Sequence, residues 1–215
     1  MTRRPLSPTT LDTPTSTSRA GGRGSGWNAH RENRRAAFSK EFMVPEGQQQ
    51  LIRFLDDEPF ESYYRHWLRD RPKGERQTFT CIGEECPLCE AGDKPAFLVL
   101  FNVIDMLADG GPMAKVWSTS PNPAGIIEEF ALDKKYSPLN RADQYFAVSK
   151  KKGANGIFGY SVMPVKARDL PEDWDGLQPI TAEQEEKLGT ERRGSDYIRT
   201  DERSVLLKLA EELED

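Results

Sequence analysis

Apolar and polar residues alternate in short segments through the middle of the chain, between about residue 45 and residue 166. Successive side chains of a strand point to opposite faces of a sheet, so this alternation predicts strands. The continuous apolar run at 95–106 is typical of a central strand. The other predicted strands are 49–56, 60–70, 76–81, 114–120 and a pair joined by a Lys/Gly/Asn hairpin within 143–167.

Three further segments carry helix signals. The segment 121–136 follows Ser120, a candidate N-cap, and repeats apolar residues at helical spacing. The segment 181–189 begins with a Thr-x-x-Gln capping signature. In the segment 201–215, a helix places three leucines on one face: Leu206, Leu209 and Leu213.

This order of elements predicts a mainly β fold with a few helices. Short strands with one inserted helix favour an OB-fold-like small barrel over 45–166, with a zinc-binding subdomain inserted at about 60–95. Residues 1–44 begin with a stretch rich in Pro, Ser, Thr, Gly and Arg, so we expect a disordered basic N-terminal arm. Residues 167–215 are expected to form an acidic C-terminal tail with short helices.

Charge is distributed unevenly along the 215 residues, although the net charge is only −5. Residues 1–50 contain eight Lys or Arg against four Asp or Glu, and residues 51–166 are balanced at fifteen against sixteen. Residues 167–215 contain seven basic against fifteen acidic side chains. A flexible anionic segment can dock basic partners, so the acidic tail is a candidate docking element for other proteins.

The sequence predicts a cytoplasmic protein, in the host cell if the chain is viral. No run of about 18 apolar residues is present, so no membrane span is expected. No apolar segment follows the arginines near the N-terminus, which argues against a signal peptide. Thiols stay reduced in the cytoplasm, so a cysteine cluster there is more often a metal site than a disulfide framework.

All three cysteines lie within nine residues, shortly after one of the two histidines. Cys86 and Cys89 form a C-x-x-C pair, whose turn lets two thiolates bind one ion. Cys81 ends a predicted strand and His66 lies on the strand before it, so a hairpin can bring in the other two ligands. A Cys3His set is typical of structural zinc, and we expect one zinc ion.

Two alternatives to structural zinc are open. In one, the C-x-x-C pair is a redox pair or a chance spacing, and His66 is an ordinary strand residue. In the other, the zinc is catalytic, as in deaminases with an H-x-E triplet and a later P-C-x-x-C. Leu68 stands where that triplet needs its acid, and four protein ligands leave no position for water. The sequence also contains no paired carboxylates or Ser/His/Asp set, so no enzyme is expected.

Alternation along the predicted strand 60–70 sorts its side chains onto two faces. The face expected to point toward core and metal carries Phe60, Ser62, Tyr64, His66 and Leu68. The other face carries an aromatic–cationic stripe: Tyr63, Arg65, Trp67 and Arg69. Rings stack on bases and guanidinium groups neutralise phosphates, so the stripe is a candidate platform for single-stranded nucleic acid. In the alternative, a neighbouring helix buries the rings and the arginines only solvate the surface.

Other basic side chains are candidate phosphate contacts. Arg53 lies on the first predicted strand. The last hairpin carries a run of three lysines at its tip: Lys150, Lys151 and Lys152. Charge runs at hairpin tips are often only solvated, which is the alternative for these lysines.

The predicted layout places a histidine and three closely spaced cysteines in a small β-barrel with a basic arm and an acidic tail. It resembles the zinc-containing single-stranded DNA-binding proteins of tailed phages, the gene-32-type replication family. The motif "YYRHWL…CIGEECPLCEAGDKP…LFNVID" carries the resemblance over about 60–105. The resemblance implies an OB-fold that coats single strands during DNA replication, recombination and repair, with zinc on His66, Cys81, Cys86 and Cys89.

The resemblance also implies partners among replication proteins and self-association along DNA, for which "RENRR" at 31–35 is a candidate segment. The expected function is therefore non-enzymatic binding of single-stranded DNA. The rival is a zinc-stabilised protein–protein adaptor whose arm and tail bind other proteins, with no nucleic-acid role.

Overall fold

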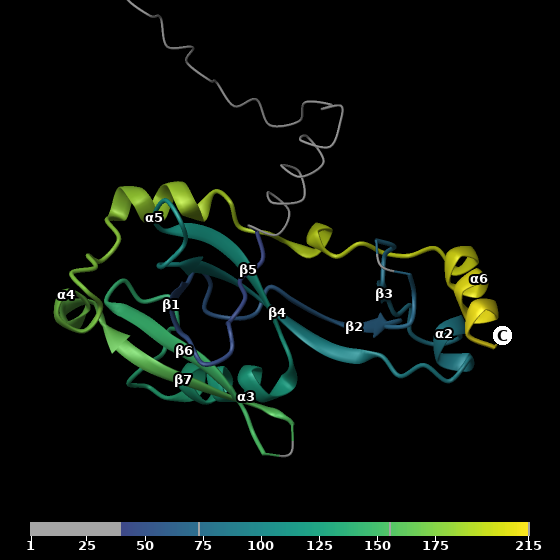
Figure 1. Cartoon of the computed structure of the whole chain (residues 1–215). Helices are drawn as coiled ribbons and strands as arrows, with labels where there is room; N and C mark the ends of the chain where they lie inside the picture. The colour runs from purple at the N-terminus through teal and green to yellow at the C-terminus, as the bar shows by residue number, and fades with distance from the viewer. Residues whose placement is uncertain (1–39, 73, 155, 215) are drawn as a thin grey trace, which may run out of the picture. The chain divides into compact units, whose positions relative to one another are not determined.

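The longest strand, β4, pairs with β1, β2 and β5 and so connects the strands of a seven-stranded antiparallel sheet (Figure 1). The computed structural model describes residues 40–72, 74–154 and 156–214, within the unit Ala37–Asp215. The strands are β1 (Gln49–Phe54), β2 (Glu61–Trp67), β3 (Thr78–Thr80), β4 (Ala96–Asp105), β5 (Met113–Thr119), β6 (Gln144–Lys152) and β7 (Phe158–Lys166). The α-helices are α2 (Pro87–Glu90), α3 (Pro121–Leu132), α4 (Leu170–Asp173), α5 (Ala182–Gly189) and α6 (Arg203–Glu214).

The strand order is β3-β2-β4-β1-β6-β7, and β5 pairs with the remaining edge of β4. One edge of β4 therefore serves two strands, pairing with β2 near its start and with β1 near its end. Within the described residues no ladder joins β5 to β7, so the sheet is open. The mainly β fold with a few helices is confirmed, and all the predicted strands are present.

Helices cover both faces of the sheet, which explains why the apolar run of β4 is unbroken. On one face, α3 packs over an aromatic cluster that includes Phe54, Phe101, Trp117 and Phe146. On the other face, α4 and α5 cover a second cluster that includes Leu51, Ile104, Tyr145 and Leu170. Residues 170–189, which we expected in an acidic tail, therefore supply part of the core.

The chain also enters the fold earlier than expected. Phe42 and Val44 are buried, and the ring of Phe42 meets Trp117 edge-on with centroids 5.6 Å apart. Glu41 forms a bridge to β5 at Val116. Phe42 and Val44 lie within the segment expected as an arm, but their side chains belong to the core. Residues 1–39 of the expected arm, including the segment "RENRR", lie outside the described residues.

Capping signals in the sequence predicted where α5 and α3 begin. Thr181 Oγ1 accepts a 3.2 Å hydrogen bond from the backbone N–H of Gln184, whose side chain accepts one from Thr181 in return, so the predicted capping box opens α5. Helix α3 begins directly after Ser120, although the Ser120 side chain makes no capping bond. Helix α4 is not among the helices predicted from the sequence, because one helical turn is too short to show a period.

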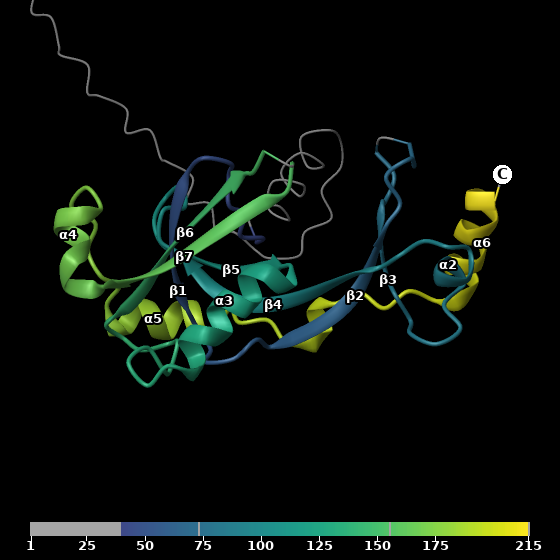
Figure 2. The same ribbon diagram turned by 90° about the horizontal axis from the view of Figure 1, so that it is seen from below.

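Beyond the main sheet, the hairpin of β2 and β3 forms a separate packing unit with α2 and α6, here called the hairpin lobe (Figure 2). Its small core consists of Leu68, Phe79, Cys86, Leu88, Leu206, Leu209 and Ala210. The leucine face predicted for the last helix is present at Leu206 and Leu209, which are buried. The β2–β3 hairpin and the C-terminal helix α6, which are far apart in the sequence, thus pack together around the predicted metal ligands.

Candidate metal centre

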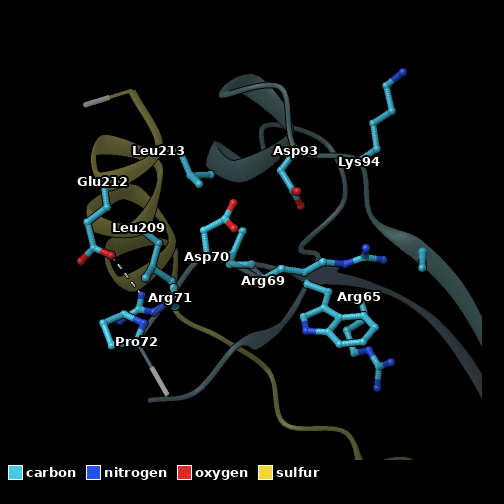
Figure 3. Close-up of a pocket in the computed structure, with 13 residues that line it drawn as sticks. Arg65, Arg69, Asp70, Arg71, Pro72, Asp93, Lys94, Leu209, Glu212 and Leu213 are labelled. Carbon is cyan, nitrogen blue, oxygen red and sulfur yellow. Dashed lines mark ion pairs between the residues drawn. The ribbon is translucent and has the colours of Figure 1, made fainter. Parts of the chain in front are cut away.

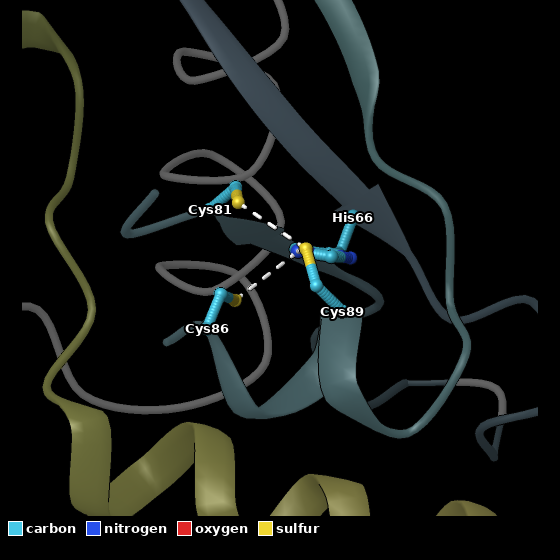
Figure 4. A group of neighbouring side chains, drawn as sticks. All are labelled: His66, Cys81, Cys86 and Cys89. Carbon is cyan, nitrogen blue, oxygen red and sulfur yellow. Dashed lines mark hydrogen bonds between the residues drawn. The ribbon is translucent and has the colours of Figure 1, made fainter. Parts of the chain in front are cut away.

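Four side chains converge inside the hairpin lobe (Figure 4). One nitrogen of His66 and the sulfurs of Cys81, Cys86 and Cys89 all lie within 4.8 Å of one another. The cluster expected from the sequence is therefore assembled by the fold.

The β2–β3 ladder positions the first two ligands. His66 on β2 stands opposite Phe79 on β3, and Cys81 follows directly after β3. The backbone N–H of Cys81 donates to the carbonyl of Tyr64 at 2.9 Å, which extends the pairing as far as the cysteine. The side chains of His66 and Cys81 are thus carried by neighbouring positions of one hairpin.

Helix α2 positions the other two ligands. Cys86 is its N-cap residue and Cys89 lies within its single turn. Pro87 suits the first helical position, because its φ is fixed near the helical value and no donor is lost there. The preceding turn contains Gly83 at φ 85°, a left-handed conformation that favours glycine.

Three of the spacings between donor atoms fit a tetrahedral zinc ion. Zn–S bonds of about 2.3 Å and Zn–N bonds of about 2.0 Å give S···S edges of about 3.8 Å and S···N edges of about 3.5 Å. The sulfurs of Cys81 and Cys89 are 3.7 Å apart. His66 Nε2 lies 3.4 Å from the Cys86 sulfur and 3.6 Å from the Cys89 sulfur.

Asp93 orients the histidine. Its Oδ2 lies 2.5 Å from His66 Nδ1, so Nδ1 carries the proton and the lone pair of Nε2 faces the three sulfurs. Carboxylate–histidine–metal arrangements of this kind fix the tautomer and raise the basicity of the ligand. The sequence reasoning missed Asp93, although an acid four residues after the last cysteine was a usable signal.

The electrostatics of the thiols favour a bound cation. Burial alone would raise the pKa of the Cys86 thiol, but backbone hydrogen bonds from Ile82, Cys89 and Leu88 lower it to about 7. Burial and the neighbouring thiols raise the pKa of Cys89 to about 12. The raised pKa of Cys89 reflects the cost of placing another negative charge beside its neighbours, and a bound metal ion is the group that offsets this cost.

The geometry argues against both alternatives. The three cysteines are free, and the convergence of His66 and Cys81 on the C-x-x-C pair is more than a redox pair or a chance spacing requires. Four protein donors complete a tetrahedron and leave no open position for a reacting water. His66 and Cys86 are also buried, under Leu206 and the other members of the hairpin-lobe core. The arrangement can hold a structural metal.

The aromatic–cationic stripe lies on one face of β2, where it reaches solvent. Trp67 is 52% exposed, and the Arg69 guanidinium carbon lies 4.9 Å from the centre of its ring. Tyr63 and Arg65 are half-buried and line a small cavity of about 250 Å³ together with Tyr197. Within the described residues no helix buries Trp67, so the alternative for this ring does not apply there.

The opposite face of β2 differs from expectation. Tyr64 and Ser62 were expected to face the core, but Tyr64 is 54% exposed and Ser62 is also exposed. The ribbon of β2 extends past the layers that cover the main sheet, so solvent reaches both of its faces at these positions. Only His66 and Leu68 are covered, because α2 and α6 pack over the far end of the strand.

The structure corrects the assignment of Arg53 as a phosphate contact. Arg53 is 2% exposed, and its Nη2 lies 2.6 Å from Glu185 Oε1 and 3.2 Å from the carbonyl of Asn140. Helix α5 covers this side of β1, so the guanidinium must find its partners inside the protein. Arg53 forms a buried ion pair with α5 and is not available to a ligand.

The three lysines lie at the end of β6 and point to a second basic region. Lys151 and Lys152 are exposed, and the Nζ of Lys150 lies 5.2 Å from the ring centre of Phe158. Strand β6 is not paired with β2, so these lysines and the stripe occupy separate strands. Figure 2 shows the β6–β7 hairpin and the β2–β3 hairpin projecting from the same side of the sheet.

Comparison with known proteins gives no relative: no family model, no curated protein and no solved structure matches this chain. In the described part of the chain, no helix has the length and apolar character needed to cross a membrane.

Proposed function

We propose that the chain is a non-enzymatic single-stranded DNA-binding protein with one structural zinc ion. The zinc would be held by His66, Cys81, Cys86 and Cys89. Soft thiolates with one imidazole in a closed tetrahedral set suit Zn²⁺. When bound, the ion would cross-link β2, β3 and α2, so that the hairpin lobe presents the stripe on a rigid support.

The main sheet supports the proposal through its connectivity, which is compatible with an OB-like barrel. Counting β1, β4, β5, β6 and β7 as five strands, the first pairs with the second and the fourth. OB-folds bind oligonucleotides on strands 2 and 3 and on the loops that join strands 1–2 and 4–5. In this chain the connection between β1 and β4 contains the stripe and the metal cluster, and Lys151 and Lys152 end β6 directly before the connection to β7.

One observation carries the proposal: Trp67 is half exposed on a strand that places Arg65 and Arg69 beside it. An exposed aromatic ring between guanidinium groups gives successive bases a stacking surface and successive phosphates a counter-charge. Such a surface is tolerant of sequence, because every base has a flat face. The protein would then coat exposed single strands during replication, recombination and repair, in the cytoplasm of a phage-infected host.

The same proposal assigns the partners. Replication proteins would dock on the acidic C-terminal region, where Glu202, Glu211 and Glu212 are exposed. Neighbouring copies would associate along the strand through the N-terminal arm.

An electrophoretic mobility shift with labelled oligo-dT tests the function. We expect a shift that unlabelled single-stranded competitor removes and that an equal mass of duplex leaves largely intact. No shift at low salt, from protein that contains its metal, would overturn the proposal.

The adaptor remains the second candidate because of one feature. A cavity of about 480 Å³ lies beside α3, between apolar side chains such as Phe97, Phe101 and Ile127. Leu132 at its margin is 79% exposed. Exposed apolar grooves often receive other proteins. An adaptor predicts no mobility shift with any oligonucleotide, so the same experiment separates the two functions.

A further inference from the structure

A cavity of about 640 Å³ separates the stripe from the C-terminal helix (Figure 3). Arg65, Trp67 and Arg69 line it from β2 and the turn that follows. Leu209 and Leu213 line it from α6. Its volume lies within the range of about 300–1,000 Å³ that is usual for small-ligand sites.

The walls of this cavity suit a flat group. Trp67 offers an exposed indole whose ring already has the Arg69 guanidinium above it. Leu213 is 44% exposed, and its side chain points from α6 toward Asp93 (Figure 3). An aromatic ring and aliphatic side chains around one space form a slot that a planar heterocycle fills well.

Both cationic and anionic side chains line the cavity. Its cations are Arg65, Arg69, Lys94 and Arg71, of which Arg71 is paired with Glu75 and Glu212. The carboxylates that line it, on Asp70, Asp93 and Glu212, would repel a phosphate from the interior, but carboxylates accept hydrogen bonds from the amino groups of bases.

Asp70 is the carboxylate placed to make such a bond. Asp93 is engaged with His66, and Glu212 with Arg71. Asp70 is exposed, and its carboxylate points between Leu213 and Asp93 (Figure 3). A base with an exocyclic amino group could therefore donate to Asp70 while its phosphates stay outside the slot.

We propose that this cavity holds one unstacked base of a bound single strand, with a preference for bases that carry an exocyclic amino group, such as cytosine. The base stacks against Trp67, its amino group donates to Asp70, and its flanking phosphates lie at the rim with Arg65 and Arg69. This inference rests on the proposed function and adds a subsite to it. It makes α6 a wall of the binding site, so the acidic C-terminal helix contributes to binding.

Two matched substitutions on α6 test the wall. Leu213 and Leu207 are 44% and 43% exposed, but only Leu213 lines the cavity. Leu213→Glu and Leu207→Glu add the same charge to the same helix. In anisotropy titrations with labelled oligo-dC, we expect Leu213→Glu to weaken binding about tenfold or more, as the loss of one stacked base does. Leu207→Glu should stay within about twofold of the unsubstituted chain.

Metal content and melting temperature of both variants show whether each is folded. Equal affinities for folded Leu213→Glu and Leu207→Glu would overturn the subsite while leaving the proposed function in place. Failure of the unsubstituted chain to bind any single strand would overturn the proposed function itself. The two failures are therefore distinguishable.

Asp70→Ala tests the preference without disturbing the apolar wall. Alanine removes the hydrogen-bond acceptor, and the position is exposed, so the fold should be unaffected. The unsubstituted chain should bind oligo-dC more tightly than oligo-dT, and Asp70→Ala should lose this difference while keeping its affinity for oligo-dT. An unsubstituted chain with equal affinity for oligo-dC and oligo-dT would overturn the role of Asp70. A preference that survives in Asp70→Ala would overturn it too.

Discussion

Asp201 Oδ2 accepts a 2.9 Å hydrogen bond from the backbone N–H of Thr80, although the two residues are 121 positions apart in the chain. The same carboxylate holds Arg76 with both oxygens, one of them at 2.8 Å. Thr80 is the last residue of β3 and directly precedes Cys81. The segment before α6 is therefore tied to the strand that delivers the first cysteine, and the C-terminal region supports the metal centre.

Replacing Asp201 should loosen this connection. We expect Asp201→Asn to lower the free energy of unfolding by about 1–3 kcal/mol, because Arg76 loses its charged partner and the backbone N–H of the partly buried Thr80 keeps a weaker one. Urea denaturation of the metal-loaded chain measures the change. Glu202→Gln is the matched control, since Glu202 is exposed next to Asp201 and should change stability little. Equal losses in the two variants would contradict the role of Asp201.

The contribution of Asp201 should depend on pH. Burial alone would raise the pKa of Asp201, but hydrogen bonds from Arg76 and Thr80 hold it below its ordinary value. A depressed carboxyl pKa stabilises the fold above the unfolded value of about 3.9, and this stabilisation is lost as the pH falls through the folded value. The gap in unfolding free energy between the unsubstituted chain and Asp201→Asn should be full at neutral pH and close below about pH 4. A gap that stays constant would contradict this.

Removing one metal ligand should cost far more than removing a hydrogen bond. We expect Cys86→Ser to lower the unfolding free energy by several kcal/mol and to abolish binding of about one zinc per chain, because structural zinc contributes folding free energy directly. Elemental analysis and thermal melting check both effects. A metal-free preparation that melts at the temperature of the loaded protein would contradict a structural role.

Asp93 should affect metal affinity without being a ligand. Because its carboxylate orients His66, we expect Asp93→Asn to weaken zinc binding about 10- to 100-fold while the loaded chain stays folded. Competition with a chromophoric chelator measures the affinity. Lys94→Ala changes the neighbouring side chain, which does not touch the histidine in the described structure, and serves as the control. Unchanged zinc affinity in Asp93→Asn would show that the hydrogen bond to His66 is dispensable.

Sequence patterns predicted most of the fold because the information was local. Alternation predicted the strands, and the Thr181–Gln184 capping box predicted the residue at which α5 begins. The spacing of the cysteines predicted the cluster, because a C-x-x-C turn brings two ligands together and a hairpin brings the other two beside them.

The errors arose where a distant segment decides the environment. Arg53 resembled a surface charge on a half-buried strand, but α5 covers it from more than a hundred residues away. Tyr64 resembled a core residue, but no layer of the described structure covers that part of β2. The role of Asp93 required knowing which ring nitrogen of His66 faces the sulfurs. The environments of Arg53 and Tyr64 have no local sequence signal, whereas an acid four residues after the last cysteine was a usable signal for Asp93.

The stripe can be tested by separating stacking from charge. Stacking is a short-range contact worth roughly 1–3 kcal/mol per base, so Trp67→Ala should weaken binding of oligo-dT about tenfold and leave its salt dependence nearly unchanged. Each phosphate contact on a single strand contributes about −0.7 to the slope of log affinity against log salt. Arg65→Ala should therefore flatten the slope by about one contact. Anisotropy titrations across a salt series measure both quantities.

Tyr64 provides the matched control for the ring. It is 54% exposed, close to the 52% of Trp67, but it lies on the opposite face of β2, where its ring centre is 5.1 Å from that of Phe97. Tyr64→Ala removes a similarly exposed aromatic from the same strand, so we expect little loss of affinity and an unchanged slope. Equal losses from Trp67→Ala and Tyr64→Ala would mean that bases do not stack preferentially on the stripe. Loss of zinc from Trp67→Ala would instead make the indole a structural support of the hairpin lobe, because His66 lies next to it in the chain.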